Sequence, residues 1–121
     1  MSQTLNYPKG PVIYYVKGDG QDILVTFTGL GSYTLEGAQI DFRVGAAVGG
    51  AASIEKSSEE SAQISIDVDN NQCSIYMDAT DTDDLGADDY VYALVLTLEG
   101  GKPVTVGLNY FVLSDTIEAA L

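Results

Sequence analysis

The sequence contains no histidine, and its one cysteine is Cys73. Without histidine the chain cannot build Ser–His or Cys–His nucleophilic sites or the common zinc sites. A single cysteine excludes an internal disulfide, and we expect Cys73, at an alternating strand position, to pack as a small hydrophobe. The Gly18–Gly20 turn lacks the further glycines and the helix of a phosphate-binding loop. Nothing singles out a glycosidase-like carboxylate pair. We therefore predict a protein that is not an enzyme, with no catalytic, cofactor or metal-ligating residues to assign.

Basic residues are also scarce, because 5 lysines and arginines face 18 acidic residues, for a net charge of −13. Nucleic-acid binding needs clustered lysine and arginine, so this balance predicts no nucleic-acid partner. It likewise argues against binding to an anionic membrane surface, and no apolar run is long enough to span a membrane. The first residues have neither the basic region nor the apolar core of a secretory signal, so we expect synthesis and use without export. A basic protein partner, or simply solubility, would explain the charge.

The acidic residues concentrate in one stretch, for which two interpretations remain open. Its members are Asp78, Asp81, Asp83, Asp84, Asp88 and Asp89. Their oxygens could bind calcium, although the EF-hand spacing is missing. Alternatively, the stretch is a solvated, tight turn over residues 80–86, in which Asp side chains cap backbone N–H groups. The eight tyrosines pose a similar choice between a sugar- or protein-binding patch and packing between strands.

Alternating apolar residues predict an all-β chain. Strands are expected at residues 12–16, 22–28, 39–48, 63–68, 73–77, 90–98 and 104–113. Residues 45–53, rich in glycine and alanine, could form a long hairpin or an irregular strand with bulges. With roughly eight short strands and no convincing amphipathic helix, the pattern favours a sandwich or a barrel. We expect an antiparallel β-sandwich of about seven to eight strands.

The last two strands give the most definite local prediction. In residues 90–98 both faces are mostly apolar, so this strand should lie in the centre of a sheet, with Leu94 and Leu96 buried. Gly100 and Gly101 predict a two-residue hairpin turn. The return strand should carry one apolar face, made of Val104, Val106, Leu108, Tyr110 and Val112. Tyr90, which follows a Leu-Gly turn, is either an ordinary strand tyrosine or the tyrosine corner of an immunoglobulin-like sandwich, whose hydroxyl bonds to the backbone upstream.

The chain is expected to form one domain at residues 11–114, preceded by an N-terminal arm at residues 1–10 and followed by a tail at residues 115–121. The arm is polar and ends at two prolines that favour extended backbone. Its apolar residues Leu5 and Tyr7 could anchor it on a neighbouring subunit, and the apolar end of the tail could dock in the same way. The alternative is that both termini are frayed ends.

Three groups of motifs, spread over residues 17–113, occur in a familiar order. They are Lys17-Gly-Asp-Gly20 with Ile23-Leu-Val-Thr-Phe-Thr28 and Leu35-Glu-Gly-Ala-Gln-Ile-Asp-Phe-Arg-Val44; Ile75-Tyr-Met-Asp-Ala-Thr-Asp-Thr82 with Leu85-Gly86 and Tyr90-Val-Tyr92; and Leu96-Thr-Leu-Glu-Gly-Gly-Lys-Pro-Val-Thr105 with Gly107-Leu-Asn-Tyr-Phe-Val112. In this order the chain resembles the immunoglobulin-like β-sandwich of bacteriophage tail and baseplate proteins, such as the N-terminal domain of upper baseplate proteins. It departs from that pattern at Asn109-Tyr110 and in the segment 45–52.

The resemblance implies a structural role without catalytic residues. The expected function is that of a stand-alone tail, baseplate or neck adaptor or accessory protein, made in the host cytoplasm and located in the virion. Its expected partners are other virion proteins and further copies of itself. The alternatives are a capsid decoration (cement) protein and a small sugar- or calcium-binding module.

Overall fold

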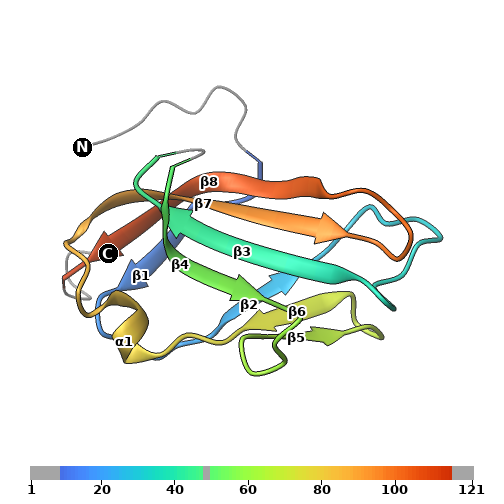
Figure 1. The fold of residues 1–121 in the computed structure, drawn as a ribbon, viewed down its shortest axis with the longest axis horizontal. Coiled ribbons are helices and arrows are strands. Elements are labelled where there is room, and N and C mark those ends of the chain that lie inside the picture. Colours follow the sequence, from blue (N-terminus) through green and yellow to red (C-terminus); the bar gives the residue numbers. More distant parts are fainter. Residues whose placement is uncertain (1–8, 48–49, 116–121) are drawn as a thin grey trace.

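The computed structural model describes residues 9–47 and 50–115, and these residues form an all-β fold, as the sequence predicts (Figure 1). In chain order the elements are β1 (Ile13–Val16), β2 (Ile23–Thr26), β3 (Gln39–Gly45), β4 (Ala52–Ser57), β5 (Ile64–Asp67), β6 (Gln72–Ile75), the single-turn helix α1 (Ala79–Thr82), β7 (Asp88–Thr97) and β8 (Val104–Ser114).

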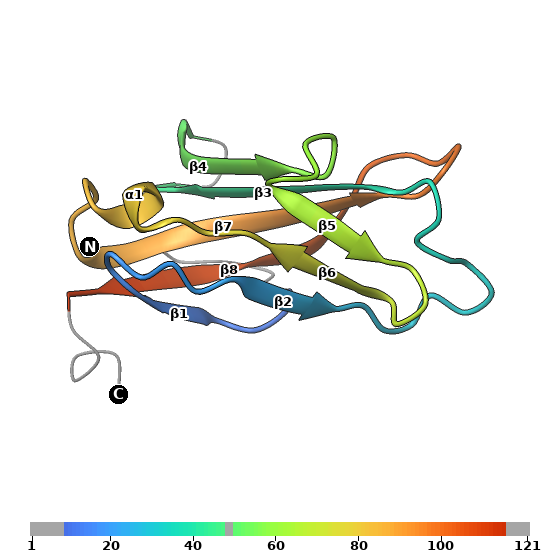
Figure 2. The same cartoon turned by 90° about the horizontal axis from the view of Figure 1, so that it is seen from below.

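The strands form two sheets that lie face to face (Figure 2). One sheet has five strands in the order β1-β8-β7-β3-β4, and the other has three in the order β2-β6-β5. Neighbouring strands pair antiparallel except at one place, where β1 runs parallel to β8. The expectation of antiparallel pairing is therefore wrong for β1. Parallel strands that follow each other in the sequence need a long crossover connection. β1 and β8 are the first and last strands, so the rest of the domain already connects them and no added crossover is needed.

The core lies between the sheets and follows the predicted alternation. In β3, Ile40, Phe42 and Val44 are buried, and the intervening Arg43 is exposed. Cys73 and Ile75 of β6 are buried in the same way. Burial also raises the pKa of the Cys73 thiol to about 11, so the thiolate that would react is disfavoured at neutral pH. Cys73 thus packs as a core residue, as expected.

The strand β7 lies in the middle of the five-stranded sheet, between β8 and β3, as its two apolar faces predict. Tyr92, Leu94 and Leu96 point into the core and are buried. On the opposite face Val91 is buried too.

Two details of the β7–β8 hairpin correct the sequence prediction. The turn is longer than two residues, since the last pair joins Leu96 to Val104. The Gly101 N–H donates to the Leu98 carbonyl, so Glu99 and Gly100 occupy the centre of the turn, and Gly100 has a φ of 73°. Only Gly100, and not the pair of glycines, supplies the left-handed conformation that the turn requires.

The second correction concerns which face of β8 is buried. Leu94 pairs with Gly107 and Val95 pairs with Thr105, so Val106 is an extra residue in a β-bulge. Beyond the bulge the alternation shifts by one, and Phe111 and Leu113 point into the core. The expected apolar face through Leu108, Tyr110 and Val112 is therefore not the core face. Period-two patterns fail at a bulge because one inserted residue exchanges the two faces.

The segment 45–53 is part of a hairpin between β3 and β4, with a shift of register between Val44 and Gly45. The hairpin and the bulge, which the sequence offered as alternatives, are thus both present. Ile54 of β4 is buried, although the sequence analysis assigned it to no strand. Residues 48–49 lie outside the described part of the chain.

The domain boundaries are described only in part. Most of the N-terminal arm (residues 1–8) and most of the tail (residues 116–121) lie outside the described residues. The last two residues of the arm are bonded to the domain, since the Lys9 N–H donates to the Leu108 carbonyl at 2.8 Å and the Asn109 side chain donates to the Gly10 carbonyl at 2.8 Å. The root of the arm is therefore attached to β8.

Candidate functional site

The acidic stretch begins with the helix α1 and is organised by local bonds. The Asp78 N–H donates to the Asp81 carboxylate at 2.8 Å, which closes the first turn of the helix. The same carboxylate forms an ion pair with Lys56 at 2.9 Å. The expected turn whose Asp side chains cap the backbone is thus present, although its first part is helical.

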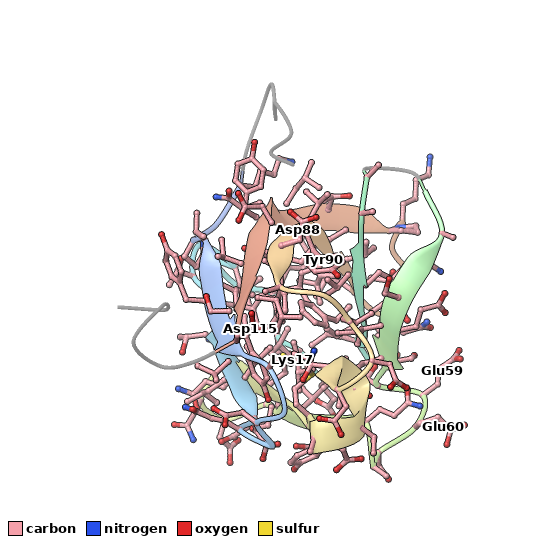
Figure 3. All side chains as sticks on the ribbon, turned by 90° about the vertical axis from the view of Figure 1, so that its left-hand side faces the viewer. Lys17, Glu59, Glu60, Asp88, Tyr90 and Asp115 are labelled. Atoms are coloured by element: carbon pink, nitrogen blue, oxygen red, sulfur yellow. The ribbon has the colours of Figure 1, made fainter. Side chains whose placement is uncertain are left out.

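The six Asp residues do not converge on a cation site in the part of the chain that the structure describes. No three His, Cys, Asp or Glu side chains there are grouped so that they could hold a metal ion. Figure 3 views this end of the molecule and shows Asp88 on one side of it, with Glu59 and Glu60 pointing away from the body on another. Nothing in this arrangement supports the calcium interpretation of the stretch.

Tyr15, Tyr90 and Tyr92 each bond a backbone carbonyl through the hydroxyl. The Tyr15 hydroxyl donates to the Gln21 carbonyl at 2.7 Å or the Asp19 carbonyl at 3.0 Å, and the Tyr92 hydroxyl to the Pro11 carbonyl at 2.6 Å. Burial, followed by the nearby Asp19 charge, raises the pKa of Tyr15 to about 12, so this donor keeps its proton across the physiological range. Tyr14 and Tyr33 are exposed but come from separate segments, β1 and the β2–β3 loop. The tyrosines within the described residues therefore serve packing and bracing more than a binding patch.

Tyr90 has the geometry of a tyrosine corner. Its hydroxyl donates to the Gly86 carbonyl, four residues upstream, at 2.8 Å (Figure 3 labels the side chain). The bond joins the beginning of β7 to the turn that follows α1. The bond from the Tyr90 hydroxyl to the upstream backbone, which the tyrosine-corner interpretation requires, is thus present.

We expect Tyr90→Phe to lower the free energy of unfolding by about 0.5–1.5 kcal/mol, because it removes one hydrogen bond and leaves the ring in place. Urea denaturation measures the change. Tyr76→Phe is the matched control, since the Tyr76 hydroxyl bonds a side chain, the Ser65 hydroxyl at 2.8 Å, where Tyr90 bonds the backbone. Equal losses in the two variants would contradict a bracing role for Tyr90.

A cavity of about 520 Å³ opens between the sheets on the side where β2 is the edge strand. Its wall includes Phe42, Tyr92 and Leu94 from the core, and Pro11 and Val106 from the five-stranded sheet and its entry. None of the residues that line the cavity carries a charge. The one phenol among them, Tyr92, already bonds the Pro11 carbonyl. The cavity is therefore suited to apolar side chains.

The rim of the cavity is the free edge of β2. The Phe27 N–H donates to the Asn71 carbonyl on the β6 side, so by alternation the N–H and C=O groups of Leu24 and Thr26 point away from β6. No described strand lies on that side. Ile23 and Val25 are only half-buried although they pack against the core, and Leu24 is 64% exposed. The edge thus offers both backbone groups and apolar side chains.

The edges on the opposite side of the molecule differ in charge. β4 carries Glu55 and Lys56, and β5 ends at Asp67. Charged side chains on an edge strand discourage pairing with another chain. In contrast, the stretch 23–31 has no charged residue. We therefore take the β2 edge and the cavity behind it as the candidate functional site and call it the β2 cleft.

The sequence analysis predicted a strand at residues 22–28 but not the cleft. Pro11, Val106 and Gly107 meet there through pairings between distant segments. One local signal was present: a glycine inside a strand marks a bulge or a close approach. A Cβ at Gly107 would lie 3.0 Å from the Leu94 Cβ and 3.0 Å from the Tyr92 ring.

No protein-family model, curated protein or solved structure matches the chain. Within the described residues, no helix has the length and apolar character needed to cross a membrane.

Proposed function

We propose that the chain is a non-enzymatic structural protein of a bacteriophage particle: a tail, baseplate or neck adaptor or accessory component that works by binding other protein chains. The observation that carries the proposal is the β2 cleft. An uncharged edge strand is a template for another strand, and this mode of recognition uses backbone bonds together with pockets for alternate side chains. The assignment to a phage particle rests on the sequence resemblance.

The chemistry of the cleft favours a protein partner over a small polar substrate. Small-molecule sites combine an apolar wall with a few polar groups that orient the ligand. Among the residues that line the cleft, only Tyr92, Thr26 and Thr28 have polar side-chain atoms. The Tyr92 hydroxyl is already bonded to the Pro11 carbonyl. Apolar side chains on an extended segment suit such a wall.

The more specific fold that we propose is an immunoglobulin-like sandwich, and the strand order supports it. In that fold one sheet contains strands C, F and G, extended by C′ in variable-type domains, and the other contains B, E and D. The sheet β8-β7-β3-β4 corresponds to G-F-C-C′, and the sheet β2-β6-β5 corresponds to B-E-D.

The tyrosine corner supports the same assignment. It is a tyrosine near the start of strand F, two residues before the cysteine that joins the sheets in antibody domains. Tyr90 lies near the start of β7, and two residues later Tyr92 occupies the cysteine position. The Tyr92 ring packs on Phe42 of β3 with centroids 5.9 Å apart. Because β3 and β7 are neighbours in one sheet, this aromatic pair takes the place of the contact that a buried strand-C tryptophan makes with the disulfide in antibody domains.

Mass spectrometry of purified phage particles tests the proposed function. We expect peptides of this protein in intact particles at a constant ratio to a tail protein. A low copy number would support a tail or neck position, whereas a copy number comparable to that of the major capsid protein would support the alternative, a capsid decoration protein. Absence from particles that infect normally would refute both.

A further inference from the structure

The β2 cleft lacks a strand that the proposed fold normally has. In the immunoglobulin-like arrangement the first strand lies beside the second, in the sheet A-B-E-D. Here β1 pairs with β8 in the other sheet, so none of the strands within residues 9–47 and 50–115 pairs with β2 on that side. The half-buried Ile23 and Val25 and the cavity behind them mark the vacant position. An added strand with apolar residues on one face would cover both.

The first eight residues of the chain have the sequence of such a strand. They read Met-Ser-Gln-Thr-Leu-Asn-Tyr-Pro, with Leu5 and Tyr7 on one face of an extended chain and Thr4 and Asn6 on the other. Eight extended residues span about 26 Å, about twice the length of the four-residue edge of β2. Pro8 ends the stretch and has no N–H to donate to a neighbouring strand.

Charge favours this occupant over other surfaces of the same protein. Residues 1–8 contain no acidic or basic side chain, and neither does the stretch 23–31. In a chain with a net charge of −13, most other contacts between copies would bring carboxylates together. Pairing two uncharged segments avoids that repulsion.

The root of the arm indicates that the strand comes from another copy. Lys9 exchanges two backbone hydrogen bonds with Leu108 of β8, both at 2.8 Å, and the Asn109 side chain holds the Gly10 carbonyl. Lys9 therefore leaves the domain beside the five-stranded sheet, whereas the vacant edge belongs to the three-stranded sheet. Proline favours extended backbone at the residue before it, and a straight arm suits the edge of a second copy better than a turn back towards its own β2.

From these observations we propose that residues 1–8 of one copy add as an edge strand to β2 of a second copy, with Leu5 and Tyr7 in the cavity between its sheets. This contact rests on the proposed function and makes it more specific. It identifies residues 1–8 of one copy and the β2 cleft of another as the two surfaces through which copies bind each other. It does not require that the particle be of a particular kind.

Disulfide trapping in the full-length chain tests the contact directly. If Leu5 and Tyr7 point inward, Asn6 faces solvent, as do Leu24 and Thr26 of the neighbour. Asn6→Cys protein is mixed with Thr26→Cys protein, or with Leu24→Cys protein for the adjacent register, oxidised mildly and analysed by non-reducing intact-mass measurement. Native Cys73 is buried and does not compete. We expect a mixed covalent dimer with at least one of the two partners.

Ser65→Cys is the matched control, because Ser65 lies on β5 at the opposite edge of the same sheet. Mixed dimers that form equally well with Ser65→Cys, or with none of the three, would overturn the proposal. The double variant Asn6→Cys/Thr26→Cys separates the two possible sources of the strand. A link found only within single chains would show that each arm covers its own β2, which also contradicts the proposal.

A cysteine-free measurement uses the two faces of the arm. We expect Leu5→Ser/Tyr7→Ser to weaken self-association about 100-fold or more in sedimentation velocity, since two apolar side chains lose their burial. Thr4→Ala/Asn6→Ala, on the solvent face, should leave it nearly unchanged. Equal behaviour of the two double variants would overturn the proposal. If particles contain the protein but neither experiment detects arm exchange, this inference fails and the proposed function stands.

Discussion

Leu94→Ala and Leu96→Ala are each expected to lower the free energy of unfolding by about 2–5 kcal/mol. Both side chains are 5% exposed and point into the core from the middle strand of the five-stranded sheet. Leu94 also packs closely on the backbone of Gly107 across the β7–β8 pair, where no side chain could fill a gap. Because β7 is held by neighbours on both sides, the backbone cannot move inward, and most of the removed volume remains as a cavity.

Urea denaturation of the two variants gives the change as a shift of the midpoint at constant slope. Val104→Ala is the control, because Val104 is 54% exposed at the end of the same hairpin and its truncation should cost well under 1 kcal/mol. Midpoints that barely move in both leucine variants would show that β7 is not the centre of the core.

Thr82→Val is expected to cost about 1–3 kcal/mol, the second largest effect. Thr82 is fully buried at the end of α1, and its hydroxyl oxygen accepts from the Gly18 N–H at 2.8 Å. This bond joins α1 to the turn between β1 and β2. Its two residues, Thr82 and Gly18, are 64 positions apart in the sequence. Valine has nearly the same shape but cannot accept, so the Gly18 N–H would be left without its partner.

Thr82→Ser keeps the hydroxyl and loses only a methyl group, so it should retain most of the stability that valine loses. Thermal unfolding followed by circular dichroism ranks the three proteins, and amide hydrogen exchange at Gly18 reports on the bond itself. If serine destabilises the protein more than valine does, packing rather than the hydrogen bond determines the role of Thr82.

These two sites together indicate how the β2 cleft is held open. Leu94 lines the cavity, and the Thr82–Gly18 bond fixes the turn from which β2 begins. A site for an incoming strand must keep its shape before the strand arrives, since ordering it afterwards would reduce the affinity. Both variants are therefore expected to weaken any contact made through the cleft, even though neither residue lies on its exposed rim.

The sequence by itself determined the all-β class, most strand positions, the packing of Cys73 and the central position of β7. Each of these follows from local, period-two alternation, which records the face of a strand that leaves water. The hydrogen bond of Tyr90 was also accessible, because its partner Gly86 is four residues away.

Only the tertiary structure decided the parallel β1–β8 pair, the bulge at Val106 and the position of β2 at the edge of its sheet among the described strands. These depend on which distant segments pair, and alternation is the same whether a strand has one neighbour or two. At Val106 the sequence pattern was misleading, because Val104 to Val112 alternates through a bulge that exchanges the faces, and the close approach of Gly107 to Leu94 and Tyr92 fixes the new register. The cleft combines Pro11, β2 and Val106, whose proximity is a property of the two packed sheets and of no single stretch of chain.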